Sequence, residues 1–290
     1  MKILLVTDSC SDLPVKYTQE NNIFVFPLTY HFKGTDNIDD FGQSISYKSF
    51  YDDVRKGEMS STSQINSYTF TEQFKKFVSD GYSVIYIAFS SALSGTYNNA
   101  CMAREEVLSE LPSADISVID SRCASMGLGL LVYYACEKLK EGMSKDELVQ
   151  WIEENKLKLN HWFTVDDLHH LRRGGRVSAT SAVIGSLLDI KPILHVDNEG
   201  RLIPVAKVKG RKKSIKTLAE ELKNRIADPE NQVIGISHGD CEEEARLLEK
   251  FIKENVTVKD VVLSYIGPVV GSHSGPGTIA LFFFGEKRDV

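Results

Sequence analysis

The sequence has few of the residues that hold small secreted domains or metal centres together. Its five cysteines among 290 residues are scattered, odd in number and form no C-x-x-C pair. This usage argues against a disulfide framework and a zinc site, and it predicts a reducing, cytoplasmic location. Only His169 and His170 are adjacent histidines, and adjacent residues point to different sides of a helix or strand. We therefore expect neither a metal nor another cofactor.

Long apolar runs and a strong excess of positive charge are also missing. No stretch reaches the roughly 18–20 apolar residues that a membrane span needs, and Asp8 comes too early for a signal peptide. The net charge of −6 argues against binding to duplex nucleic acid, because such binding depends on neutralising phosphates. With 42% hydrophobic and 26% charged residues, the chain is expected to fold rather than stay disordered.

The common catalytic signatures are absent as well. There is no Walker A motif, and residues 271–275 carry His273 where a G-x-S-x-G nucleophile elbow needs serine. The enzymatic alternative that remains is a hydrolase or phosphotransferase that uses Asp8 and Ser9 at the end of the first predicted strand. No general base lies at a recognisable spacing from Ser9, which weakens this alternative.

The first half of the chain does contain a regular alternation of strand and helix patterns. Short β-branched and aromatic runs predict strands at residues 3–9, 23–32, 83–90 and 116–121. Helical patterns lie between and after them, at residues 68–80, 96–110 and 124–142. This order predicts a mostly parallel sheet with helices on both faces, an α/β Rossmann-like domain over residues 1–160.

The second half predicts a separate α+β domain over residues 161–290. Residues 191–210 have the pattern of a hairpin, with Asn198–Gly200 as the turn between apolar strands. Residues 178–189 predict a helix capped by Ser178, with one apolar face formed by Val183, Ile184, Leu187 and Leu188. The chain as a whole is therefore expected to be an α/β protein of two domains.

Two hydroxyl-rich stretches precede predicted helices. Ser94, Gly95 and Thr96 follow a strong strand pattern and open a helix, and residues 60–67 precede the helix predicted from residue 68. Backbone N–H groups at a helix start, with neutral hydroxyl donors, suit a small oxyanion such as a carboxylate. Ordinary helix capping explains the same residues about equally well.

Two basic stretches stand out in an otherwise acidic chain. Arg172, Arg173 and Arg176 surround two glycines, which is the composition of an anion clamp or of an exposed turn. Residues 207–216 hold six lysines and arginines, which favours a solvated helix start. A nucleic-acid-binding regulator that uses this segment is the second alternative, and a transient contact with an acidic partner or membrane surface is left open.

Several blocks, taken in order along the chain, resemble the DegV family of bacterial fatty-acid-binding proteins. The resemblance extends from Thr7 to Thr278 and rests on the ordered set rather than on any one block. The blocks are TDSCSDLP, TSQ, SSALSGTYNNA, VIDS, LRRGGRVS, KPIL, KGRKKSI and GPVVGSHSGPGT. Two positions depart from the family pattern: Ile65 replaces an expected proline, and Cys10 replaces a small hydroxyl residue and is not counted as a ligand.

The resemblance implies a long-chain fatty acid in a tunnel that the second domain closes. Its carboxylate would be bound by Thr62, Ser94 and His273. The supporting residues would be Gly95, Thr96, Ser272 and Ser274, and the tail would lie among apolar side chains that include Val183, Ile184, Leu187 and Leu188.

The resemblance also implies a role for the protein in phospholipid metabolism. Such proteins are lipid-presenting subunits of fatty acid kinase, and a separate kinase phosphorylates the bound carboxylate. Arg173 and Arg176 would lie at the carboxylate mouth or the kinase contact. The chain itself would then bind and present its ligand without catalysing a reaction, and it would bind no nucleic acid.

Overall fold

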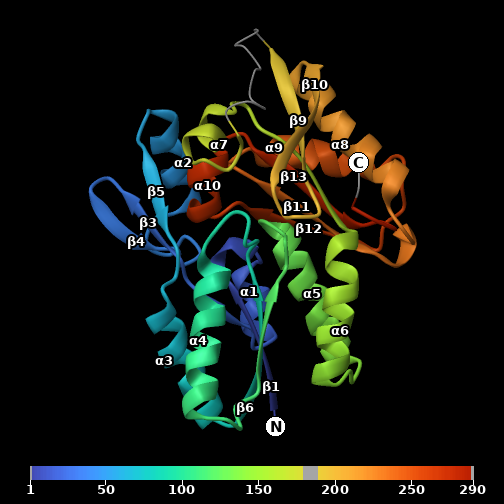
Figure 1. Ribbon diagram of the computed structural model, residues 1–290. Helices are drawn as coiled ribbons and strands as arrows, with labels where there is room; N and C mark the ends of the chain where they lie inside the picture. The colour runs from blue at the N-terminus through green and yellow to red at the C-terminus, as the bar shows by residue number, and fades with distance from the viewer. Residues whose placement is uncertain (1, 179–188, 289–290) are drawn as a thin grey trace.

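The computed structural model describes residues 2–178 and 189–288, whose strands form three sheets. Figure 1 shows a lower part built on a parallel sheet with long helices, an upper part built on a larger sheet, and a small sheet at one side. The predicted α/β class is confirmed. The predicted division at residue 160 lies next to the first residue of the larger sheet, and it stays a prediction.

The lower sheet is parallel throughout, as the alternating pattern predicts, and has the strand order β2-β1-β6-β7. Its strands are β1 (Lys2–Asp8), β2 (Phe24–Phe26), β6 (Tyr82–Ala88) and β7 (Ile116–Asp120). The helices of this part are α1 (Val15–Glu20), α3 (Ser67–Ser79), α4 (Thr96–Glu110), α5 (Met126–Lys140) and α6 (Lys145–Asn155). The carboxyl ends of the strands point toward the upper part, so the loops that follow them face the other sheet (Figure 1).

The strand predicted over residues 23–32 is wrong as a single element. Pro27 lies between β2 and β3 (Thr29–Phe32), and these two strands belong to different sheets. Proline has no N–H for a ladder, and the N–H of Leu28 donates to the Ser9 hydroxyl at 3.1 Å instead. The chain therefore leaves the parallel sheet at this point.

The small sheet was not expected from the sequence. It is antiparallel, with the order β4-β3-β5, and contains β4 (Thr35–Ile38) and β5 (Ser60–Ser63) beside helix α2 (Tyr47–Arg55). The sequence of β5 is Ser-Ser-Thr-Ser, which has none of the apolar alternation that predicts a strand. Its pairing with β3 places Thr62 opposite Tyr30.

The upper sheet has six strands in the order β10-β9-β8-β13-β11-β12, and only the β11–β12 pair is parallel. They are β8 (Leu159–Thr164), β9 (Ile190–Val196), β10 (Leu202–Lys209), β11 (Val233–His238), β12 (Asp260–Tyr265) and β13 (Ile279–Phe284). The helices of this part are α7 (His169–Arg173), α8 (Arg211–Arg225), α9 (Glu242–Lys253) and α10 (Pro268–Ser274). Three short 3-10 turns complete the elements: η1 (Ser9–Ser11), η2 (Lys156–Lys158) and η3 (Pro229–Asn231).

The two faces of the upper sheet pack against different partners. Trp162, Leu281 and Phe283 lie in a core with α8 and α9, whereas Phe163 and Phe282, at alternating positions, join the main core below. Alternation of side chains along a strand explains this division. The helix predicted with Ser178 as its cap lies outside the described residues from Ala179 onward, and so do Val183, Ile184, Leu187 and Leu188.

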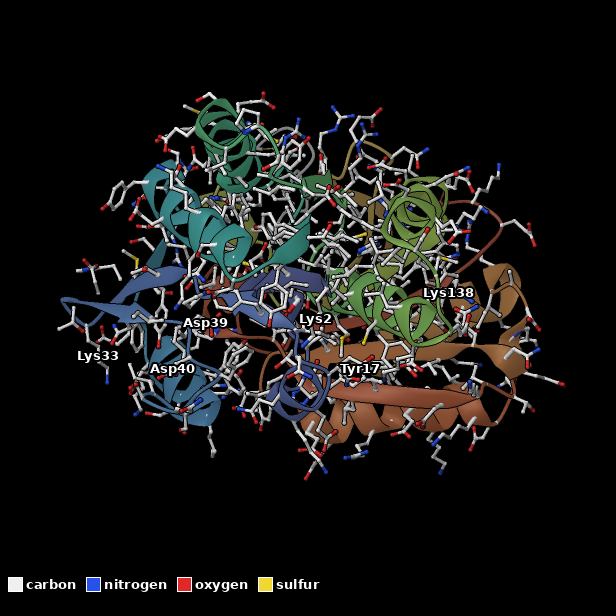
Figure 2. All side chains as sticks on the ribbon, turned by 90° about the horizontal axis from the view of Figure 1, so that it is seen from below. Lys2, Tyr17, Lys33, Asp39, Asp40 and Lys138 are labelled. Atoms are coloured by element: carbon white, nitrogen blue, oxygen red, sulfur yellow. The ribbon has the colours of Figure 1, made fainter. Side chains whose placement is uncertain are left out.

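Buried carboxylates lie where the two parts meet. Asp12 accepts a hydrogen bond from the Gly267 N–H at 2.8 Å and another from the Ser125 hydroxyl. Burial raises the pKa of Asp39 to about 7. Figure 2 shows Lys33 at the outer turn of the small sheet, with Asp40 and then Asp39 nearer the centre of the molecule.

The replacement Asp39→Asn is expected to stabilise the protein at pH 8. The folded-state pKa of about 7 lies above the ordinary value near 3.9, so the folded state binds the extra proton and loses stability as the pH rises from about 4 to 7. Removing the charge should raise the free energy of unfolding at pH 8 by up to about 4 kcal/mol, since the pKa is raised by about three units and one unit corresponds to about 1.4 kcal/mol.

Urea unfolding at pH 5 and pH 8 measures this effect. The control is Asp40→Asn, which keeps a side-chain oxygen for the Gln43 N–H and should leave the pH dependence in place. An Asp39→Asn protein with the same loss of stability between pH 5 and pH 8 as the wild type would contradict the assignment.

Candidate functional site

A cavity of about 390 Å³ lies between the upper and lower parts of the molecule. This volume is within the usual range of small-molecule sites. Most of its lining is apolar and comes from both parts: Leu28, Phe89, Leu93, Ala124, Phe163, Leu171, Val196, Leu202, Ile266, Val269, Val270, Ala280 and Phe282. Thr62, Ser94, Arg176 and His273 line the same cavity.

Thr62 and His273 are in direct contact. The Thr62 hydroxyl lies 2.8 Å from Nε2 of His273, although the two residues are 211 positions apart in the chain. Burial, and then the charges of Arg176 and Arg173, lower the pKa of His273 to about 4. The imidazole is therefore neutral at pH 7, and its single N–H and the threonine O–H supply two polar hydrogens. Their mutual bond uses one, so either tautomer leaves one hydrogen for another acceptor.

His273 lies on a helix, α10, although glycines flank it closely in the sequence. Helix α10 starts at Pro268, a residue favoured in the first turn. Gly271 is needed inside this helix because a Cβ there would collide with the Tyr51 hydroxyl. The glycine loop itself begins only at Gly275, whose φ of +79° requires glycine.

Ser94 is held at the start of α4, as the sequence predicts. Its Oγ accepts a hydrogen bond from the Thr96 N–H at 3.2 Å and lies 2.9 Å from the Thr96 hydroxyl. Gly95 lets the Gln64 side chain approach, because a Cβ at this position would collide with it. Ile65, in place of the expected proline, has its carbonyl bonded to the Asn99 side chain at 2.7 Å, which ties this segment to α4.

Arg176 connects the segment that carries Ser94 with the segment that packs against His273. Its Nε donates to the Leu93 carbonyl at 3.1 Å, next to Ser94, and its Nη1 donates to the Gly174 carbonyl. Gly174 in turn lies against His273, because a Cβ on it would overlap Nδ1 of the ring. Within the described part of the chain Arg176 forms no ion pair with a carboxylate, so its positive charge remains available to an anion.

Arg173 occupies a different position from Arg176. It ends α7, is exposed, and its guanidinium lies 3.1 Å from Nδ1 of His170. It is not among the residues that line the cavity. The two arginines named together from the sequence are thus separated into one inside the cavity and one on the surface beside it.

The two serines that flank His273 also differ. Ser272 donates its hydroxyl to the Pro268 carbonyl one turn earlier in α10, at 2.6 Å. Ser274 lines the cavity, and its Oγ is buried without a hydrogen-bond partner among the described residues. Ser274 therefore has a free hydroxyl at the cavity wall, and Ser272 does not.

Asp8 and Ser9, the residues of the enzymatic alternative, have structural roles. The Asp8 side chain is fully buried and accepts hydrogen bonds from the Tyr86 hydroxyl at 2.8 Å and the Phe89 N–H at 2.9 Å. Ser9 accepts from Leu28 as described above, and neither residue lines the cavity. This arrangement gives a substrate no access to either side chain.

Arg211 is a positioning residue that the sequence did not single out from its basic stretch. Its guanidinium donates to the Gly277 carbonyl, forms an ion pair with Glu244 at 2.8 Å and lies 3.7 Å from Asp166. It thereby braces the glycine loop behind α10. The block KGRKKSI contains this residue. Nothing in the sequence of residues 207–216 indicates that one of their six basic side chains points inward.

Cys10 also lines the cavity, although it was not counted as a ligand. Burial raises the pKa of its thiol well above the ordinary value, so it is neutral. Among the described residues no group of three or more His, Cys, Asp and Glu side chains could hold a metal ion. Nor does any described helix have the length and apolar character to cross a bilayer.

The fold and cavity together define an α/β protein that encloses a mostly apolar cavity whose polar lining includes Thr62, Ser94, Arg176 and His273. Comparison with known sequences identifies the family. The profile of the DegV family, described as uncharacterised, matches residues 2–286. A DegV domain-containing protein of Clostridium perfringens is 50% identical over 99% of both chains. The chain belongs to the DegV family, as its sequence blocks indicated.

Solved structures of DegV proteins have the same fold. The fatty-acid-binding DegV protein of Bacillus subtilis is 32% identical, covers 99% of this chain and 100% of its own, and has a TM-score of 0.84. A Thermotoga maritima protein with a fatty-acid-binding function is 30% identical over 98% of this chain and 99% of its own, with a TM-score of 0.84.

The replacement Gly174→Ala should break the contact between Thr62 and His273 without unfolding the protein. The new methyl group would occupy the space of Nδ1 and displace the ring. NMR of protein labelled with ¹⁵N in the histidine rings should show a shift of the His273 nitrogens comparable to that caused by Thr62→Ala. Gly175→Ala is the control: its φ of +69° adds backbone strain, but nothing lies within 4 Å of a Cβ there, so the His273 signals should stay in place. Unchanged His273 signals in Gly174→Ala would refute the packing argument.

Proposed function

We propose that this protein binds a long-chain fatty acid in the cavity, with the carboxylate at Thr62, Ser94 and His273 and the tail among the apolar side chains. The observation that carries the proposal is the convergence of these three side chains and Arg176 at one end of an otherwise mostly apolar cavity. A ligand that fits must be long and apolar and must end in a small hydrogen-bond acceptor. A fatty acid has this chemistry.

The polar end suits a carboxylate better than a neutral group. Thr62 and His273 together retain one free polar hydrogen, and the hydroxyls of Ser94 and Ser274 line the same cavity, that of Ser274 without a partner among the described residues. Arg176 adds a positive charge that forms no ion pair with a carboxylate of residues 2–178 or 189–288. Hydrogen bonds to an ionised acceptor are roughly twice as strong as neutral ones, which favours the anion in a partly dry site.

The related structures support the same ligand. The Bacillus subtilis and Thermotoga maritima proteins bind fatty acids and share the fold along nearly the whole chain. For this protein, each buried methylene would contribute about 0.8 kcal/mol to binding. The tail would therefore supply most of the affinity, and the polar end would set the orientation.

We further propose that the bound carboxylate is presented to a separate fatty acid kinase in the cytoplasm, for the synthesis of phospholipids. Arg176 would meet the phosphoryl group as it is transferred to the carboxylate, because its guanidinium is already at the polar end of the cavity. Arg173 would contact the kinase from its exposed position at the end of α7. In this proposal residues 1–160 and 161–290 act as two domains that close on the ligand, and catalysis belongs to the partner.

The double replacement of Ser94 and His273 by alanine should weaken fatty-acid binding at least about tenfold, since each lost charge-assisted bond is worth roughly 1.5–3 kcal/mol. The measurement is mass spectrometry of the organic extract of the purified protein, followed by titration with oleic acid. Ser272→Ala is the matched control, because that hydroxyl bonds to its own helix. A wild-type protein that neither carries nor takes up fatty acid would overturn the proposal. Wild-type affinity in the double variant would overturn the site assignment alone.

The replacement Arg173→Ala should leave fatty-acid binding unchanged and slow phosphoryl transfer. The test mixes the loaded protein with a purified bacterial fatty acid kinase and ATP and measures acyl phosphate as its hydroxamate. Arg172→Ala, an exposed neighbour on the same helix, is the control for loss of charge. Equal rates for Arg173→Ala and the wild type would argue against a kinase contact at this residue.

A further inference from the structure

One row of side chains across four neighbouring strands of the upper sheet lines the cavity. Leu202 pairs with Val196, and His161 pairs with Phe282. His195 on β9 pairs with Trp162 on β8, and because these strands are antiparallel, the next residues, Val196 and His161, lie opposite each other. Paired residues on antiparallel strands point to the same face of the sheet. All four members of the row line the cavity.

This row lies away from His273. Along the segment that enters β13, Thr278, Ala280 and Phe282 line the cavity at alternate positions. At about 3.4 Å per residue, Thr278 and Phe282 are separated by roughly 14 Å. The Thr278 hydroxyl donates to the carbonyl of Ser274, the last residue of α10, at 3.0 Å. Thr278 therefore marks the side of His273, and Phe282 in the row lies roughly 14 Å from it along the strand.

Two of the four side chains in this row, those of His161 and Phe282, are held in place by neighbouring residues. Nδ1 of His161 lies 3.1 Å from the Leu159 carbonyl, and Nε2 accepts from the Ala124 N–H at 3.3 Å. Helix α5 packs closely against the ring, since a Cβ at Gly127 would collide with it. Phe282 is buried and meets the imidazole edge-on, with ring centres 5.3 Å apart.

The other half, Val196 and Leu202, belongs to the hairpin of β9 and β10. The hairpin turn, Asp197–Arg201, rests on the lower part of the molecule. The Ser90 hydroxyl donates to the Gly200 carbonyl at 2.9 Å, and Arg122 donates to the Asn198 carbonyl at 2.9 Å. Gly200 has a φ of +82°, and a Cβ there would collide with Ser90. These contacts fix how far the hairpin reaches over the cavity.

We propose that this hairpin determines the length of the acyl chain that the protein accepts, with Val196 and Leu202 as the stop for the methyl end. The inference rests on the proposed fatty-acid function. A chain that is too short leaves a void at the row, and one that is too long must displace packed side chains, both of which are unfavourable in a close-packed interior. The turn contacts set the position of the stop.

The first experiment fills the space at the stop. Wild type, Leu202→Trp and Val196→Leu are titrated with saturated fatty acids from lauric to stearic acid, and the lipids that copurify are identified by mass spectrometry. Ile203→Trp is the matched control: Ile203 pairs with His195, whose ring lies against that of Trp162 at the opposite face of the sheet. Leu202→Trp should shift the preference toward shorter chains by about tenfold or more, and Val196→Leu should shift it less in the same direction.

The second experiment moves the stop without filling it. Gly200→Ala should displace the turn from Ser90 and broaden the range of chains bound, toward longer ones. Gly34→Ala is its control, since Gly34 has a similar φ of +78° with nothing within 4 Å of a Cβ. Any strain at a positive φ is thus matched, and only the contact differs.

The outcomes separate the two proposals. A wild type that binds no fatty acid overturns the proposed function, whatever the variants do. A wild type that binds fatty acid, with folded variants of Leu202, Val196 and Gly200 that keep its chain-length preference, overturns the role of the hairpin alone. A folded Leu202→Trp protein that loses all chain lengths equally has the same meaning.

Discussion

The hydrogen bond between Thr62 and His273 is the contact on which the site depends. Thr62 belongs to the small sheet in the first half of the chain, and His273 belongs to the helix that leads into the last strand of the upper sheet. Their meeting requires that α10 be held against the first half. Asp12 does this through the Gly267 N–H, and Tyr51 does it by donating to the Ile266 carbonyl at 2.9 Å. A buried carboxylate outside the cavity thus supports the geometry within it.

The site combines neutral donors with one cation. His273 is kept neutral because burial and the nearby arginines oppose a second positive charge. Neutral hydroxyl and imidazole groups need no buried counter-ion, so the empty protein does not bear the cost of several unpaired charges. Arg176 is only half-buried and is satisfied in part by two backbone carbonyls. The arrangement suits a ligand whose charged end is small and whose remaining length is apolar.

Much of the fold could be predicted from local patterns, because buried parallel strands and amphipathic helices have strong periodicities. The start of α4 at Ser94–Thr96 was predictable for this reason. The site residues were named from ordered blocks that resemble the family, and their functional roles stay proposals. The small sheet was not predictable, since β5 consists of hydroxyl residues and is held by backbone pairing with β3. The different positions of Arg173, on the surface, and Arg176, at the cavity, could not be predicted either, because both residues occur in one short basic turn.

The sequence by itself determined the α/β class, the family and the residue types available for an anion, because these follow from periodicity and from motifs along the chain. Only the tertiary structure decided which of those residues meet. It brought residues 62, 94, 176 and 273 to one end of a cavity and left Asp8 and Ser9 buried outside it. It also turned Arg211 inward and brought Val196 and Leu202 of the β9–β10 hairpin into the cavity lining. The physical reason is that contacts between residues hundreds of positions apart depend on packing between sheets, which no local pattern records.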